Sequence, residues 1–483
     1  MNLTELEQVR KNRLDQIRQL GDDPYGRANP DTISISRCRE LFATWETNTA
    51  LEPRSVGVQG RIILLRDNGG LIWAQVRDET GTIQVAISKK DVRSPTDFQL
   101  GKLLDLGDII LPRGSVRRTK TGEVTIWCES LDIQCKSLAH PPDKVAGLQD
   151  IEQRYRKRYL DMAFNGEFTR TLQMRSAIVS TIRHLFSKGG YTEVETPMLH
   201  GIAGGAAARP FKTHLNALDV DLFLRVAPEL YLKRLIVGGM SRVFEINRNF
   251  RNEGIDATHN PEFTALEAYG VNEDVDSLID FVGNMLSTLV HILKRENGLC
   301  SNLPLNHIAY DGKSIDFGSY KVVSYQDLYQ EGVGRDLLSE TDFVAANRRF
   351  EEECECLIDP CIPTFVVGYP AVISPLTKQS RDNPLIADRA DLFIGGMEIG
   401  TIYTEQNDPQ VQFDVFSRQI DDADENTHRT MDEDFVEALK VGMPPTGGLG
   451  LGIDRLVMLL CDKTSVRDVL AFPFMRPLTE APL

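Results

Sequence analysis

The chain of 483 residues is longer than one ordinary hydrophobic core requires, so we expect two or three domains. Hydrophobic residues make up 41% of it and charged residues 26%, which is typical of a globular protein. No apolar run approaches the ~20 residues that cross a bilayer, so we expect no membrane partner. The net charge of −16 means that the overall field does not attract nucleic acid, and any such binding needs a local basic surface.

The first residues, 1–18, alternate charges with spaced Leu and Val and lack the apolar stretch of a signal peptide, which predicts a cytoplasmic protein. The eight cysteines are scattered, as expected for reduced thiols. Cys354, Cys356 and Cys361 form one cluster, but it lacks a nearby histidine and a second cysteine pair. Buried or helix-side thiols are therefore favoured over a zinc site.

The first predicted region is a helical segment, residues 1–54. Leucine and isoleucine recur at roughly helical spacing over residues 3–20 with arginines between them, which predicts an exposed amphipathic helix. Its basic residues, and a second basic cluster at residues 154–158, are on their own most simply solvated helix faces.

Short β-rich runs separated by turn signals fill residues 55–138. The runs are residues 56–65, 71–76, 82–87, 108–111 and 124–128. Five short strands over about 80 residues fit a small closed barrel such as an OB-fold, which presents one strand face to single-stranded nucleic acid. Residues 139–150 contain a Pro-Pro pair and predict a linker.

The remainder, residues 151–483, mixes long helical patterns with β-rich runs, and predicts an α+β domain with a sizeable core. The helical patterns cover residues 171–188, 275–295 and 342–354.

Three segments of this last domain carry the strongest signal. They are residues 190–199, residues 248–264 with Arg251-Asn-Glu253-Gly and His259-Asn-Pro, and the glycine-rich residues 448–456 ending in Asp454-Arg455. In this order they resemble the three signature motifs of class II aminoacyl-tRNA synthetases. Residues 204–211, 225–234 and 244–248 resemble the lysyl enzymes in particular, and the resemblance covers nearly the whole chain.

The resemblance implies an α+β fold, in which an N-terminal OB-fold β-barrel precedes a class II antiparallel sheet flanked by helices. It implies activation of lysine, or a close analogue, with ATP and transfer to tRNA(Lys). It also implies a homodimer built through the first motif, around Glu195-Thr196-Pro197.

The chemistry suits arginine. Adenylate formation is an in-line attack of a carboxylate on the α-phosphorus of ATP, so the protein mainly aligns two anions and stabilises charge on phosphate oxygens. A planar guanidinium binds both kinds of oxygen in pairs. By resemblance, Arg251 bridges the α-phosphate and the amino-acid carboxylate, and Arg455 covers the adenine and holds the γ-phosphate. The remaining ATP-binding positions by resemblance are Glu253, His259, Asn260 and Phe263.

Magnesium is implied because the leaving pyrophosphate carries charge that hard, oxygen-bound cations stabilise. Asp391 and Glu398, in a strand–turn–strand segment, match the family's Mg²⁺ ligands. Lysyl enzymes usually have Glu where this chain has Asp391, which predicts altered metal geometry and no loss of the site.

Anions that receive an ammonium decide the amino acid, because a buried ammonium is costly unless it is paired. Glu405, with Tyr269, is the candidate for the side-chain ammonium, and Glu229 and Glu267 serve the ammonium or the α-amino group. The predicted amino-acid-binding set by resemblance is Glu229, Arg251, Glu267, Tyr269, Thr401, Tyr403 and Glu405.

The chain departs from the lysyl pattern at three places. Thr401 stands where Asn is usual, and a hydroxyl makes fewer hydrogen bonds than an amide. Ile402 puts a branched side chain where Gly or Ala is usual, which could reshape the pocket. The region 333–362 is also shorter than usual.

These departures leave an alternative open. The chain could be an adenylate-forming paralogue that uses a modified lysine or a non-tRNA acceptor, in a secondary pathway or in inhibitor resistance. A non-catalytic, synthetase-like RNA-binding module is a third reading, but it should lose Arg251, Arg455 or the acidic pair.

The barrel favours tRNA charging over a free-standing ligase. By resemblance, the residues that contact the anticodon are Arg66, Trp73, Gln84 and Glu129. Trp73 replaces the usual phenylalanine and keeps a stacking face, and stacking on an aromatic ring contributes ~1–3 kcal/mol per base.

Overall fold

The computed structural model describes residues 3–47, 55–139, 148, 150–206, 208–300, 302–421 and 431–477. The chain divides into two compact units, Met1–Thr169 and Arg170–Leu483. The predicted linker at 139–150 lies mostly outside the described residues. No helix of the described part is long and apolar enough to span a bilayer.

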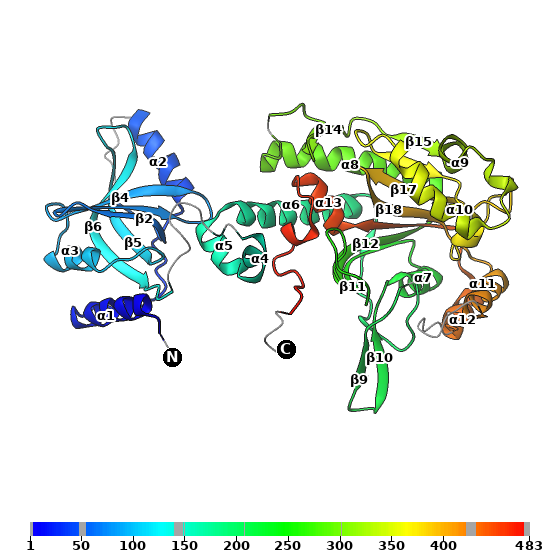
Figure 1. Ribbon diagram of the computed structural model, residues 1–483, viewed down its shortest axis with the longest axis horizontal. Helices are drawn as coiled ribbons and strands as arrows, with labels where there is room; N and C mark the ends of the chain where they lie inside the picture. Colours follow the sequence, from blue (N-terminus) through cyan, green and yellow to red (C-terminus); the bar gives the residue numbers. More distant parts are fainter. Residues whose placement is uncertain are drawn as a thin grey trace. The chain divides into compact units, whose positions relative to one another are not determined.

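The first unit contains a closed six-stranded barrel (Figure 1). Its strand order is β1-β5-β2-β3-β4-β6, and β5 also pairs with β6, which closes the sheet. The predicted strand at 56–65 is split, because its first part pairs with Arg113–Ser115 and its second part with Ile109 and Ile110. The strands are β1 (Ser55–Gly57), β2 (Gly60–Asp67), β3 (Leu71–Arg77), β4 (Thr82–Ser88), β5 (Ile109–Arg118) and β6 (Val124–Cys135).

Helices accompany the barrel. The predicted N-terminal helix is α1 (Glu5–Gln19), which begins with a capping box between Thr4 and Glu7. Arg10 is buried and donates hydrogen bonds to three carbonyl oxygens near the ends of β5 and β6, so one predicted basic residue is a structural contact. The other helices of this unit are α2 (Ile35–Thr47), α3 (Pro95–Lys102), α4 (Ile151–Arg156) and α5 (Arg158–Phe164).

The second unit is built on an eight-stranded sheet of order β15-β16-β17-β18-β19-β12-β11-β7, antiparallel except at its two ends. One face packs against long helices in the main hydrophobic core (Figure 1). Those helices are α6 (Glu167–Lys188), α8 (Val275–Asn297) and α13 (Ile453–Leu460), and the strands are β7 (Thr192–Glu193), β11 (Arg242–Phe250), β12 (Glu262–Val271), β15 (Lys321–Ser324), β16 (Thr364–Val367), β17 (Arg389–Ile394), β18 (Met397–Thr404) and β19 (Thr446–Gly452).

Smaller elements surround the other face and the sheet ends. A three-stranded sheet extends from the unit as a hairpin (Figure 1). Residues 333–362 form a helix, a single π-turn and two short 3₁₀ turns that border a small core, with Cys354 buried, Cys356 exposed and Cys361 half-buried. The elements are β8 (Leu199–His200), β9 (Lys212–Leu215), β10 (Val220–Leu224), β13 (His307–Tyr310), β14 (Lys313–Asp316), α7 (Glu229–Val237), α9 (Tyr325–Val333), α10 (Phe343–Arg349), α11 (Pro409–Asp421) and α12 (Glu433–Gly442).

Candidate active site

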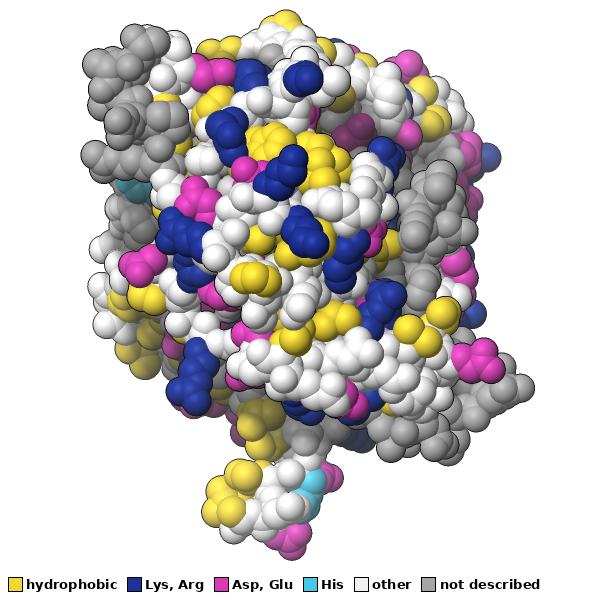
Figure 2. Space-filling view, turned by 90° about the vertical axis from the view of Figure 1, so that its left-hand side faces the viewer, with side chains coloured by type: hydrophobic (Ala, Val, Ile, Leu, Met, Phe, Trp, Pro, Cys, Tyr) yellow, Lys and Arg dark blue, Asp and Glu magenta, His cyan; other side chains and the backbone are white. Residues whose placement is uncertain are grey.

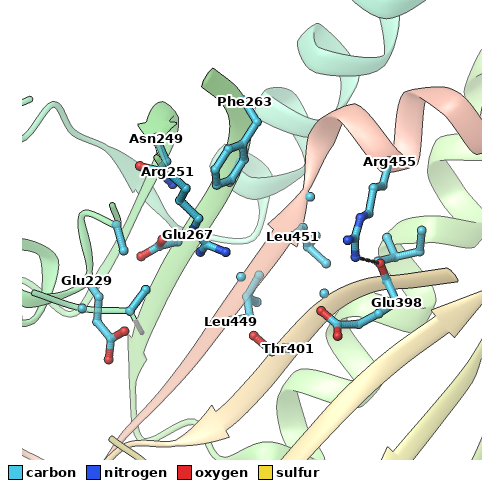
Figure 3. Close-up of a pocket in the computed structure, with 18 of the residues that line it drawn as sticks. Glu229, Asn249, Arg251, Phe263, Glu267, Glu398, Thr401, Leu449, Leu451 and Arg455 are labelled. Carbon is cyan, nitrogen blue, oxygen red and sulfur yellow. Dashed lines mark hydrogen bonds between the residues drawn. The ribbon is translucent and has the colours of Figure 1, made fainter. Parts of the chain in front are cut away.

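A cavity of about 500 Å³ lies over strands β11, β12, β18 and β19, on the sheet face opposite the main core. Figure 3 shows Glu229 at one side and Arg455 with Glu398 at the other, with Arg251 and Glu267 between them. All predicted residues of this domain line the cavity except Asp391 and Glu405. Those that line it are Glu229, Arg251, Glu253, His259, Asn260, Phe263, Glu267, Tyr269, Glu398, Thr401, Tyr403 and Arg455.

Two arginines line the cavity, Arg455 at one end and Arg251 between that end and Glu229. Arg251 follows β11, and its guanidinium lies 5.0 Å from the ring centre of Phe263. Its Nε is buried and has no hydrogen-bond partner among the described residues. A flat ring and an unpartnered, planar cation at one place suit a base and a phosphate.

The second arginine, Arg455, comes from the start of α13 and is aimed across the cavity. Its Nη1 donates to the carbonyl oxygen of Glu398 at 2.7 Å, and its Nη2 lies 3.3 Å from Nε2 of His259. His259 Nδ1 lies 2.8 Å from Asp256. An Nε2 that accepts from Arg455 requires the neutral tautomer that donates from Nδ1 to Asp256, so these contacts fix the imidazole beside the arginine.

Asp454 connects the second and third motifs. One oxygen accepts from the backbone N–H of Thr264 at 2.9 Å, and the other lies 2.6 Å from Arg175. The aspartate next to Arg455 therefore holds β12 against α13 and is itself 4% exposed. Asp454 is also one of the residues that line the cavity.

The other end of the cavity carries carboxylates. Glu267 on β12 has its pKa raised to about 8, first by burial and then by the charge of Glu229, while Arg251 lowers it. The hydroxyl of Tyr269 lies 3.4 Å from Glu267. A cation entering this end would meet Glu229 and Glu267 together.

Behind this end lies a fully buried lysine. Lys233 on α7 forms ion pairs with Glu229, at 2.6 Å, and with Glu405. Burial first raises the pKa of Glu405, which stands at about 7, and Lys233 lowers it. Glu405 is thus placed beneath the cavity floor, with its charge already met by a lysine of the chain, and its role toward the substrate stays a prediction.

Gly448 explains part of the glycine-rich motif. A Cβ built at this position would lie 1.9 Å from a Glu405 oxygen and 2.7 Å from the Tyr269 ring. The bare backbone of β19 is what lets both side chains approach the floor of the cavity.

The two predicted metal ligands differ in their surroundings. Asp391 is 3% exposed and accepts two hydrogen bonds from Arg389, at 2.9 and 2.7 Å. Glu398 reaches the cavity because β18 has a bulge at Ile399, which brings Glu398 to the face of Thr401. Burial, and then the charge of Asp391, raise the pKa of Glu398, so the two carboxylates are electrostatic neighbours.

These residues fit magnesium in part. The described residues contain no group of three potential metal-ligating side chains. Magnesium at nucleotide sites commonly takes only one or two carboxylates and completes its shell with phosphate oxygens and water. Glu398 is free to do this, whereas Asp391 has to share its carboxylate with Arg389.

The departures from the lysyl pattern have different consequences. Thr401 lines the cavity, as expected. Ile402 is 0% exposed and packs in the main hydrophobic core on the other side of the sheet. Ile402 therefore makes no direct contact with the cavity that would support its predicted reshaping of the pocket, because its side chain points away from the cavity.

Sequence reasoning missed several lining residues, among them the polar Asn249 and Arg389. Asn249 lies on β11 two positions before Arg251, and its buried Oδ1 has no partner among the described residues. Arg389 lies two positions before Asp391 on the same face of β17. The period of two along a strand was the available signal for both.

On the barrel, Arg66 and Trp73 are directly paired across β2 and β3, and Gln84 is one strand further on. Glu129 lies beyond them on β6 and forms an ion pair with Arg93 at 2.5 Å. Figure 2 shows Lys and Arg side chains interspersed with apolar ones on the barrel side of the chain. Basic side chains are therefore present on this face although the net charge of the chain is −16.

Known proteins agree with this geometry. Residues 150–476 match the family of class II tRNA synthetases (D, K and N), and residues 56–133 match the OB-fold nucleic acid binding domain. The chain is 42% identical to the lysine–tRNA ligase of Carboxydothermus hydrogenoformans, over 98% of this chain and 99% of that protein. It is 41% identical to that of Enterococcus faecalis, over 97% of each. The chain belongs to the class II tRNA synthetases, and within them to the lysyl branch.

Proposed function

We propose that the chain activates lysine with ATP in this cavity and transfers the lysyl group to tRNA(Lys). The observation that carries the proposal is the position of Arg251, between the carboxylates at one end and the Phe263–Arg455 end (Figure 3). A single guanidinium there can hold the carboxylate of an amino acid whose ammonium groups lie toward Glu229 and Glu267. The same guanidinium can contact the α-phosphate of ATP.

The first step joins the two substrates. A carboxylate oxygen of lysine attacks the α-phosphorus, and the bond from that phosphorus to pyrophosphate breaks. Negative charge grows on the phosphate oxygens, and Arg251 and Arg455 stabilise it where it grows. The protein mainly supplies alignment and positive charge, and the adenine stacks on Phe263, beside His259 and Asn260.

The amino-acid end selects a cation. Glu229 and Glu267 receive the ammonium groups of lysine directly, and Tyr269 orients Glu267. Glu405 acts from behind, by sharing Lys233 with Glu229. Thr401 and Tyr403 complete the wall beside the substrate carboxylate.

The proposal also includes magnesium, as a cation at the phosphates of ATP. Glu398, supported by Asp391, would hold the ion against the phosphates, where it would supply charge stabilisation for the leaving pyrophosphate. Arg389 keeps the Asp391 carboxylate oriented toward this place.

The proposed macromolecular partners are tRNA and a second copy of the chain. The face with Arg66, Trp73 and Gln84 takes the anticodon bases. The segment around the first motif and the β8–β10 sheet exposes apolar side chains that support a homodimer, namely Met198, Leu199, Leu215, Leu218 and Val220. Sedimentation of the purified protein at increasing concentration tests this, and a monomer at all concentrations would contradict it.

The direct test of function is the charging of a tRNA(Lys) transcript with labelled lysine by the purified chain. Acid-precipitable lysyl-tRNA that depends on ATP is expected. If lysine supports ATP–pyrophosphate exchange but no tRNA is charged, the acceptor is a different molecule and the transfer step proposed here is wrong.

A further inference from the structure

The barrel face contains a second aromatic and basic pair beside the predicted anticodon set. The register places Arg66 opposite Trp73, Trp73 opposite Ala86, and Ala86 beside Trp127. Arg117 lies two positions beyond the next partner along β5. Across β2, β3, β4, β6 and β5 the face therefore reads cation, ring, small residue, ring, cation.

The two rings meet over the small residue. The ring centres of Trp73 and Trp127 are 5.9 Å apart at an interplanar angle of 72°, and Ala86 between them is fully covered. Alternation along β6 turns Ile126 and Cys128 into the barrel core and leaves Trp127 half-buried on the outer face. Trp127 is thus not part of the core, and the exposed part of its side chain lies on the same outer face as Trp73.

Among the described residues, neither the buried indole N–H of Trp127 nor the Arg117 guanidinium has a hydrogen-bonding or carboxylate partner. The indole N–H of Trp127 has no hydrogen-bond acceptor among the described residues. The Arg117 guanidinium lies 4.9 Å from the Trp127 ring centre, and no carboxylate of the described residues pairs with it. In a chain with an excess of acidic residues, an exposed arginine without a carboxylate is left for an outside anion.

Gln84 lies on the same face, between the two rings in the strand order. Its Oε1 accepts a hydrogen bond from Thr125 at 2.8 Å, which leaves the amide N–H₂ as the outward donor. A ring, a guanidinium and a fixed amide donor together suit the flat face, the phosphate and the edge of an unpaired nucleotide.

We propose that Trp127 and Arg117 form a second nucleotide subsite, which stacks a base of single-stranded RNA next to the base held by Trp73. The proposal rests on the proposed binding of tRNA by the barrel, and it extends the anticodon set by one nucleotide. The base stacks on the exposed part of Trp127, and Arg117 holds the adjoining phosphate.

The test is the affinity of the full chain for a short RNA hairpin that carries the anticodon loop of tRNA(Lys). Trp127→Leu keeps an apolar side chain and removes the stacking surface, so binding should weaken about 10-fold, within the range for one lost stacked base. Trp127→Phe keeps a ring and should restore most of the affinity. Arg117→Gln should weaken binding less and reduce its salt dependence, whereas the control Arg37→Gln, on the exposed face of α2, should change neither.

Hairpins in which single loop nucleotides are abasic identify the partner of each ring. One abasic position should remove the effect of Trp127→Leu, and a different one should remove the effect of Trp73→Leu. If both substitutions couple to the same nucleotide, the rings form one subsite and the inference is overturned. It is also overturned if Trp127→Leu binds normally while Trp73→Leu is weakened, an outcome that leaves the proposed function intact. If neither tryptophan affects binding, the barrel face is not the RNA surface and both proposals about it fail.

Discussion

The two ends of the cavity differ in whether their charged side chains form ion pairs within the chain. Arg251 and Arg455, the two arginines assigned to ATP, form no ion pair with a carboxylate of the described residues. At the other end, Glu229 and Glu405 share Lys233. In the empty site, partly exposed guanidinium groups can be hydrated by water. Buried ionised carboxylates without a cation nearby would instead be strongly destabilising. The arginines assigned to ATP therefore need no carboxylate of the chain in the empty site, whereas the buried glutamates at the other end need the cation of Lys233.

Arg251→Ala should have the largest effect, because it removes the group proposed to contact both substrates. We expect kcat/KM for ATP–pyrophosphate exchange to fall about 100- to 1000-fold, the range seen when one preorganised donor to a transition-state oxyanion is lost. Arg248→Ala is the matched control. It lies on β11, three residues before Arg251, is half exposed, and among the described residues pairs with Glu262, so exchange should change less than about 3-fold. Equal losses in both variants would remove the special role of Arg251.

Lys233→Met should act first on stability, since it leaves Glu229 and Glu405 without their buried cation. We expect the free energy of unfolding to fall by about 3–5 kcal/mol, as for other broken buried pairs. Lys440→Met, which breaks an exposed pair with Glu437, should cost well under about 1 kcal/mol. Circular dichroism is the suitable measurement, because all three tryptophans lie in the first unit. Partial recovery in Lys233→Met/Glu405→Gln would identify the uncompensated carboxylate as the cause.

The raised pKa of Glu267 predicts a pH dependence of lysine binding. An ammonium binds the ionised carboxylate, so the Kd for lysine should fall as the pH rises through about 8, by up to about 10-fold between pH 7 and 9. Since the folded protein holds this proton more tightly than the unfolded chain, Glu267 lowers stability progressively as the pH rises from 4.5 toward 8. Calorimetric titration at several pH values measures the Kd, and Glu267→Gln should flatten the profile. A profile with the same slope in that variant would assign the titration elsewhere.

Thr401→Asn should have the smallest effect. It restores the amide usual in lysyl enzymes at a position that lines the cavity. We expect the KM for lysine to change by a few-fold, which corresponds to the net free energy of about one hydrogen bond. Ile402→Val, a core change on the opposite face, should leave the KM for lysine unchanged and cost about 0.5–1.5 kcal/mol of stability. A larger KM change from Ile402→Val than from Thr401→Asn would reverse the assignment of the two faces.

Sequence reasoning predicted the barrel strands and the main helices, because strand alternation and helical spacing are local properties. The resemblance to the lysyl enzymes supplied the candidate site residues, and all of those in the second unit except Asp391 and Glu405 line the cavity. Sequence reasoning could not predict that Lys233 lies against Glu405, since they come from α7 and from the end of β18, far apart in the chain. It assigned Ile402 to the pocket because the family pattern gives a position and not a side-chain direction. The bulge at Ile399, which sets which face Glu398 and Thr401 share, depends on the pairing of β17 with β18 and has no local signal.

The most direct test of the comparison between the two ends is ATP–pyrophosphate exchange with lysine and with norleucine, which has the same six-carbon chain and lacks the side-chain ammonium. The charge arrangement predicts saturable exchange with lysine and none above background with norleucine. Exchange supported equally by norleucine, or absent with lysine, would contradict a carboxylate end built to receive a cation.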